Sequence, residues 1–192
     1  QIYADVRKFN LGGTIENRAA DPGFEQSGPA GDLADDAIET KTGRELVTQF
    51  RSQGVTLFQS PGTPFRCNFS DQEQHGGKYA FSFWGTQSGS VIKEARGIKL
   101  EPSDRLRCSL WYKRNAGAGN YSVHMIARDQ TGGIFSRTVF NLEESADRWN
   151  QFMLYYIVPQ GAKQVSMLVV VKNQERGARF YVDDFFIGKY PN

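Results

Sequence analysis

Two adjacent carboxylates near the end of the chain, Asp183 and Asp184, stand among aromatic and β-branched residues. The surrounding run, residues 179–188, has the composition of a strand that lies against a core. A buried carboxylate is unfavourable unless it is paired, hydrogen-bonded or bound to a metal, so a partner must meet at least one of them. Alternation along a strand predicts that the two side chains point to opposite faces and do not flank a single bond.

An acidic turn near the start of the chain, Asp21-Pro22-Gly23-Phe24-Glu25, is the best candidate for that partner. If the first and last strands are neighbours, Glu25 and one of the two aspartates share a hard cation. Calcium fits best, because it prefers carboxylate and carbonyl oxygens. The spacing is equally compatible with aspartates that end the strand in solvent or form ion pairs with Arg179 or Lys189.

Length and composition favour one domain and exclude several classes of protein. The 192 residues suffice for a single sizeable core, and 14 Phe and 8 Tyr favour sheets. A net charge of +2, with basic residues scattered among strands, argues against nucleic acid as a partner. No apolar run is long enough to span a membrane. The chain begins at Gln1 without a signal peptide, as if already trimmed.

The two cysteines, Cys67 and Cys108, are expected to remain buried thiols unless their strands prove adjacent. They do not form a zinc site, because the only histidines are His75 and His124 and no metal-binding spacing occurs.

Period-two alternation dominates the rest of the chain and predicts a series of short strands. Residues 165–171 are almost continuously apolar, which indicates a central strand covered on both faces. The pattern favours an all-β fold, an antiparallel two-sheet β-sandwich of jelly-roll type, with at most one or two short helices. The predicted strands cover 55–58, 78–84, 105–113, 121–128, 134–140, 149–158, 165–171 and 179–188.

Two segments lack this regularity. Residues 1–20 are interpreted as an extended N-terminal arm or a first strand, and residues 26–71 as a long, loop-rich insertion within the single domain 1–192. Within the insertion, Thr42 and Glu45 have the spacing of a capping box, which predicts a short helix through Phe50. The same letters also permit a strand.

Five segments, in order, resemble the β-sandwich (jelly-roll) carbohydrate-binding modules of the galactose-binding-like superfamily. They correspond to the opening turn of that family, the strand after it, a long central segment, a W-x-x-F motif followed by a P-x-G-A motif, and the closing strand. The insertion departs from the family pattern, because it is longer than usual and lacks the tryptophan that commonly follows the opening turn. The five segments are PGFE (22–25), GKYAF (77–81), LEPSDRLRCSLWYK (100–113), WNQF with VPQGA (149–152, 158–162) and YVDDF (181–185).

The resemblance implies a mainly structural calcium ion. Carried over to this sequence, the ligands would be Glu25, Asp183 or Asp184, and the carbonyl oxygen of Lys78. It also implies an extracellular or envelope-associated module of a larger sugar-processing protein, binding a poly- or oligosaccharide.

A sugar site combines aromatic platforms with a few placed polar groups, so an aromatic residue on the polar side of a strand is informative. Alternation places Trp111 with Arg107 and Lys113, away from the apolar face. It places Trp84 with the small residues Ala80 and Ser82. The competing interpretation for each tryptophan is a ring covered by a loop.

His124 and Arg128 lie on the polar face of their own strand. If the strands at 107–113 and 122–128 pair, these groups and Trp111 line one concave, basic and aromatic groove. Such a groove would suit a uronate or sulfated glycan as well as a neutral one.

Catalysis is the minority interpretation. No nucleophile elbow, phosphate-binding loop or zinc-protease motif occurs, and Glu143-Glu144 is more simply a solvated turn. We therefore expect a non-catalytic carbohydrate-binding module. The alternatives are a protein-interaction or interdomain β-sandwich, and a polysaccharide lyase in which tyrosine, His124 and Arg128 transfer protons.

Overall fold

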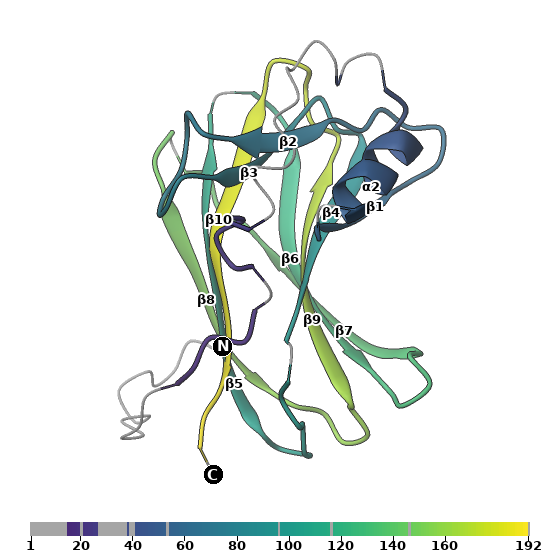
Figure 1. Cartoon of the computed structure of the whole chain (residues 1–192), viewed down its shortest axis with the longest axis vertical. Coiled ribbons are helices and arrows are strands. Elements are labelled where there is room, and N and C mark those ends of the chain that lie inside the picture. Colours follow the sequence, from purple (N-terminus) through teal and green to yellow (C-terminus); the bar gives the residue numbers. More distant parts are fainter. Residues whose placement is uncertain are drawn as a thin grey trace.

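The computed structural model of the chain (Figure 1) contains two packed antiparallel sheets and a helix at one edge. Residues 1–14 of the predicted N-terminal arm and much of the segment 26–40 lie outside the described residues. The structure describes residues 15–19, 21–26, 38, 41–52, 54–95, 97–115, 117–145 and 147–191.

Each sheet has five strands, which confirms the predicted two-sheet all-β sandwich. What we call the front sheet has the order β1-β4-β9-β6-β7, and the back sheet has the order β2-β3-β10-β5-β8. The front strands are β1 (Thr56–Gln59), β4 (Ser88–Glu94), β9 (Gln164–Lys172), β6 (Asn120–Arg128) and β7 (Ile134–Asn141). The back strands are β2 (Cys67–Ser70), β3 (Ala80–Trp84), β10 (Arg179–Lys189), β5 (Arg105–Arg114) and β8 (Asn150–Ile157).

The core lies between the two sheets, where the apolar sides of the alternating strands meet. Phe180 of β10 and Tyr121 of β6 stack across it with ring centroids 4.4 Å apart. The strand β9, predicted to be central, is the middle strand of the front sheet. Burial of this apolar area is the main force that holds the sheets together.

The strand β10 changes its neighbour halfway along its length. It pairs with β3 only from Arg179 to Val182, and a bulge follows between Asp183 and Phe186. Beyond the bulge the main-chain N–H of Arg18 donates to the carbonyl of Ile187 at 2.8 Å. The N-terminal segment thus runs beside the last strand (Figure 1, purple beside yellow).

The segment 26–71 contributes to both sheets and is more than an insertion of loops. It contains helix α2 (Gly43–Ser52), β1 and β2. The capping box is formed, since the Thr42 main-chain N–H donates to Glu45 Oε2 at 2.7 Å and the Glu45 N–H to Thr42 Oγ1 at 3.3 Å. This decides the helix-or-strand alternative in favour of the helix.

The strands β2 and β4 were not predicted from the sequence. In β4, polar Ser88, Ser90, Lys93 and Glu94 surround only two large apolar residues, so its alternation is weak. Its inward-facing Lys93 is buried, with Nζ 2.6 Å from the carbonyl oxygen of Asp21 and 3.8 Å from the ring centroid of Phe24.

Cys67 and Cys108 are buried free thiols, as expected. They lie on β2 and β5, which are separated in the back sheet by β3 and β10. Burial raises the pKa of both thiols. Within the described part of the chain, no helix has the length and apolarity to cross a lipid bilayer.

Candidate functional site

The opening turn, residues 21–26, is anchored by the buried ring of Phe24. This ring stacks on Phe81 with a centroid distance of 5.4 Å and meets Phe185 edge-on at 5.9 Å. Such aromatic pairs add to the stabilisation from area burial alone. The anchor holds the turn against the bulge of β10.

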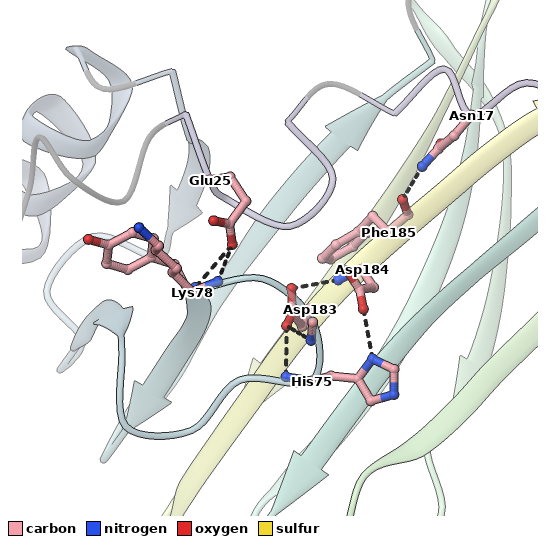
Figure 2. Close-up of polar contacts among 9 residues, drawn as sticks. Asn17, Glu25, His75, Lys78, Asp183, Asp184 and Phe185 are labelled. Atoms are coloured by element: carbon pink, nitrogen blue, oxygen red, sulfur yellow. Dashed lines mark hydrogen bonds and ion pairs between the residues drawn. The ribbon is translucent and has the colours of Figure 1, made fainter.

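Main-chain and amide hydrogen bonds fix the same contact. The Phe185 N–H donates to the Pro22 carbonyl at 3.0 Å. The Asn17 side chain donates from Nδ2 to the Phe185 carbonyl at 2.8 Å (Figure 2) and accepts from the Ile187 N–H at 3.1 Å. The predicted proximity of the opening turn and the last strand is therefore present.

Asp183 is fully buried, at 0% exposure, and its carboxylate is held by main-chain N–H groups. Its Oδ2 accepts from His75 at 2.9 Å and from Gly76 at 3.1 Å, and its Oδ1 accepts from Asp184 at 2.7 Å (Figure 2). Burial raises the pKa of Asp183 to about 6, the negative Asp184 adds to the rise, and the N–H donors oppose it.

Asp184 adopts a positive φ of 46° in the bulge of β10. A bulge re-aims side chains, and here it turns Asp184 toward the same loop that caps Asp183. A Cβ on Gly76 would lie 2.6 Å from Asp184 Oδ2, and a Cβ on Gly23 would lie within 4 Å of both carboxylates. The expectation that the two aspartates point to opposite faces is wrong for this reason.

Glu25 contacts the same loop at the residues that follow His75 and Gly76. Its Oε1 accepts from the main-chain N–H groups of Lys78 at 2.8 Å and Tyr79 at 3.1 Å (Figure 2). A Cβ on Gly77 would overlap the Glu25 carboxylate. Lys78 therefore touches Glu25 through its N–H, whereas the predicted metal ligand is its carbonyl oxygen.

These acidic groups offer oxygen donors beside three glycines that leave room for them, which suits a hard cation in chemistry. Among the described residues, no group of three His, Cys, Asp or Glu side chains is arranged to hold a metal ion. An ion here would need main-chain oxygens in addition to carboxylates.

His75 connects this acidic cluster to the outer face of the back sheet and was not predicted as a site residue. Its Nδ1 lies 2.7 Å from Asp184 Oδ2 (Figure 2), and its ring stacks on Trp111 at 3.8 Å. Trp149 meets His75 edge-on at 5.7 Å. The ring of Trp111 is thus covered by a loop residue, as in the competing interpretation.

The other predicted back-sheet residues are also engaged within the protein. Lys113 Nζ lies 2.8 Å from Glu73 Oε2 and 3.5 Å from Asp147 Oδ1. Trp84 is only 4% exposed, and the Arg179 guanidinium lies 4.8 Å from its ring centroid, so this ring is not an open platform.

The predicted groove shared by Trp111 and His124 does not exist. The strand β5 pairs with β10 and β8, whereas β6 pairs with β9 and β7 in the other sheet. Arg107, Trp111 and Lys113 therefore lie on the outer face of the back sheet, and His124 and Arg128 on the outer face of the front sheet. Alternation assigns a side chain to a face but does not identify the neighbouring strand.

Arg107 and Arg128 each contact groups of their own sheet. The Arg107 guanidinium lies 5.3 Å from the ring centroid of Phe186. Arg128 donates from Nη1 to the Gly132 carbonyl at 3.3 Å, at the hairpin between β6 and β7. Neither residue lines the hollow described next.

The outer face of the front sheet carries a hollow of about 770 Å³, lined by residues of β6, β7 and β9 together with Arg114 and Gly119. We call it the front hollow. Register places its strand residues on one face, because Ser122 pairs with Asn141, His124 with Val139 and Asn120 with Lys172. The polar residues that line it include Asn120, Ser122, His124, Arg137, Asn141 and Lys172.

His124 lies at the centre of this arrangement and is 5% exposed. Arg137 donates from Nε to His124 Nδ1 at 3.0 Å and from Nη2 to the same nitrogen. Ser122 Oγ lies 2.9 Å from Nε2. Burial, followed by the charges of Arg137 and Lys172, lowers the pKa of His124 to about 4, so the imidazole is neutral at pH 7.

An apolar side chain lies across the same face from the hollow. The row that starts at Asn141 continues through Ser122, Val170 and Ser90 to Phe58 on β1. Phe58 is 59% exposed. Sequence reasoning missed Phe58, Arg137 and Lys172. The alternation of residues 134–140 was the signal that could have placed Arg137 on this face.

Comparisons with known proteins bear on the fold. No family model and no curated protein sequence matches the chain. The enzymatically active domain of bacteriophage CBA120 tailspike protein 4 superimposes with a TM-score of 0.54 at 14% identity, over 70% of this chain and 19% of that one.

Two carbohydrate-binding modules superimpose over most of their length. The C-terminal family 22 carbohydrate-binding module of Clostridium thermocellum Xyn10B gives a TM-score of 0.51 at 12% identity, over 71% of this chain and 85% of that one. The CBM22-1 xylan-binding domain of Paenibacillus barcinonensis Xyn10C gives 0.50 at 14% identity, over 71% and 86%. At these identities the likeness is one of fold, and the chain has the β-sandwich fold of these carbohydrate-binding modules.

Proposed function

We propose that the protein is a non-catalytic carbohydrate-binding module whose ligand lies on the outer face of the front sheet. The observation that carries this proposal is the front hollow, an open site lined by hydroxyl, amide and cationic groups. Its volume falls in the range of roughly 300–1,000 Å³ that is usual for ligand sites. The family 22 modules of the same fold, one of them named a xylan-binding domain, support the same class of ligand.

The row from Asn141 to Phe58 crosses the front sheet from β7 to β1. Its middle members Val170 and Ser90 are only 7% and 3% exposed, so an extended ligand would make its contacts towards the two ends of the row. The hydroxyl of Ser122 and the amide of Asn141 match sugar hydroxyls. The exposed ring of Phe58 offers an apolar surface for the face of a sugar ring. A glycan chain that follows this row would meet polar groups first and the aromatic ring at the far side.

The same geometry argues against a lyase. No carboxylate of the described residues lines the front hollow. Both nitrogens of His124 lie within hydrogen-bond distance of neighbours, and a proton acceptor needs a free nitrogen close to its substrate. The alternative in which His124 and Arg128 transfer protons is disfavoured, because Arg128 lies away from the hollow.

We also propose that a structural calcium ion links the opening turn to β10. Its ligands would be Glu25, Asp183 or Asp184, and main-chain oxygens that include the carbonyl of Lys78. Supporting observations are the convergence of these acids on one loop and the glycines that make space for them. The buried Asp183 carboxylate is the group that such an ion would stabilise most.

The proposed setting is a larger, secreted or envelope-associated protein that acts on polysaccharides. The chain covers most of two family 22 carbohydrate-binding modules but only 19% of the tailspike domain. A module of this kind would hold its parent protein on the polymer.

A glycan microarray tests the proposal directly. We expect binding to at least one oligosaccharide class, and hydrogen–deuterium exchange with that glycan should protect β6, β7 and β9. Protection of residues 71–79 instead would move the site to the back sheet. Absence of binding to every glycan would contradict the proposal and favour the protein-interaction alternative.

A further inference from the structure

We infer that the front hollow selects anionic glycans, those that carry carboxylate or sulfate groups, and that Arg137 with Lys172 binds the anionic group. This inference rests on the proposed function and specifies its ligand class.

The charges that line the hollow are of one sign. Its lining includes Arg114, Arg137 and Lys172, and no Asp or Glu of the described residues. Arg114 is partly neutralised, since its Nη2 lies 3.6 Å from Glu144 Oε1. Arg137 and Lys172 have no carboxylate within ion-pair distance among the described residues. Two uncompensated cations therefore face the same hollow.

Arg137 is oriented by a neutral group. An arginine in a folded protein is commonly fixed by a carboxylate, which cancels its charge. Here the fixing group is the imidazole of His124, which accepts from Nε and Nη2 at its Nδ1. The guanidinium is held in place, keeps its full positive charge, and retains N–H donors on the side away from His124.

The tautomer of His124 follows from the same contacts. Because Nδ1 accepts from Arg137, the proton of the neutral ring lies on Nε2 and is donated to Ser122 Oγ at 2.9 Å. Burial is the main cause of the low pKa of His124, and the positive charges of Arg137 and Lys172 lower it further. The imidazole therefore does not compete with Arg137 for an incoming anion.

Lys113 on the back sheet and Lys172 on the front sheet differ in whether carboxylates surround them. On the back sheet, Lys113 is surrounded by Glu73 and Asp147. Lys172 on the front sheet is exposed without such partners. Preorganised and unpaired cations on one face are the arrangement that charged sugars need for charge-assisted hydrogen bonds.

The test uses the purified chain and three polymers in calorimetry or affinity electrophoresis. The probes are polygalacturonate, dextran sulfate, which carries sulfate but no carboxylate groups, and polygalacturonate whose carboxylates have been reduced to hydroxymethyl groups. We expect an acidic polymer to bind at least about tenfold more tightly than the reduced polymer. This preference should fade at about 1 M salt, where the Debye length is only about 3 Å. The two acidic arms distinguish a carboxylate site from a sulfate site.

Matched variants locate the effect. Arg137→Gln and Lys172→Gln should each weaken acidic-polymer binding, Arg137→Gln by about tenfold or more. Arg137→Lys keeps the charge but loses the paired contact with His124, so we expect an intermediate loss. Lys163→Gln removes the same charge from an exposed loop outside the hollow and should change little. Thermal melting confirms that each variant is folded.

The outcomes separate the inference from the function on which it rests. Equal binding of the acidic and reduced polymers, unaffected by Arg137→Gln, would overturn the anionic preference and leave a module for neutral glycans. Equal losses for Lys163→Gln and Lys172→Gln would reduce the effect to net charge and overturn the site. Binding to none of these polymers and to no glycan on the microarray would overturn both proposals.

Discussion

The two outer faces of the sandwich carry similar residue types in opposite states. On the back face, the ring of Trp111 is covered by His75 and the charge of Lys113 is cancelled by Glu73. On the front face, Phe58 is exposed and Arg137 is oriented by the neutral His124. The neighbours of a side chain, rather than its type, therefore decide whether it can meet a ligand. The back-face groups are engaged by neighbouring side chains, whereas Phe58 is open to solvent and Arg137 keeps its charge.

The largest expected difference is between a core phenylalanine and the exposed phenylalanine of the front face. Phe24→Ala removes the ring that anchors the opening turn in the core, and we expect the free energy of unfolding to fall by about 3–5 kcal/mol. Phe58→Ala removes an exposed ring and should change stability by no more than about 0.5 kcal/mol. Denaturant unfolding measures both. Equal losses would contradict the division between a structural and an exposed side.

Calcium removal tests only the proposed link between the opening turn and β10. Chelation with EDTA should lower the melting temperature, since an ion that binds only the folded state stabilises it by about 2.7 kcal/mol at a hundredfold excess over its Kd. Asp184→Asn should abolish the response, and Arg137→Gln should retain it. A melting curve that does not change on chelation would count against the ion.

Lowering the pH should affect stability in opposite directions through His124 and through Asp183. The pKa of His124 is about 4 in the folded state against 6.5 for an ordinary histidine, so the unfolded state binds the proton first. Its contribution is present above pH 6.5, is lost as the pH falls toward 4, and is on the order of 1–3 kcal/mol. The raised pKa of Asp183, about 6, acts in the opposite direction between about pH 6 and 3.8.

The contribution of His124 is therefore measured as a difference. Unfolding free energies of the wild type and of His124→Gln, both in EDTA, should diverge in slope between pH 6.5 and 4, with the wild type losing more stability. Parallel curves would show that His124 is not held neutral.

The smallest expected effects are the changes in stability and in glycan affinity on replacing Lys113 or Lys172. Lys113→Gln breaks a partly buried ion pair and should cost about 1 kcal/mol of stability while glycan affinity is unchanged. Lys172→Gln should do the reverse. Melting and calorimetry on the same two variants measure both quantities, and a loss of affinity for Lys113→Gln would contradict the assignment of the faces.

All strands except β2 and β4, and the contact between the opening turn and the last strand, could be predicted from the sequence because their signals lie in short stretches of residues. Alternation placed Trp111 and Lys113 on one face. The need of a buried carboxylate for a partner placed Glu25 near Asp183 and Asp184. Partner strands were beyond that reasoning, since the pairing of β5 with β10 joins residues far apart in the sequence. The turn of Asp184 depends on a bulge, and the cover over Trp111 depends on His75 in a polar loop with no periodic signal.

The central claim is that the glycan lies on the front sheet. Calorimetry with the tightest-binding glycan of the microarray tests it most directly, with Trp111→Ala compared against the double variant Arg137→Gln and Asn141→Ala. We expect the double variant to lose most of its affinity and Trp111→Ala to bind like the wild type. Binding abolished by Trp111→Ala and retained by the folded double variant would contradict it.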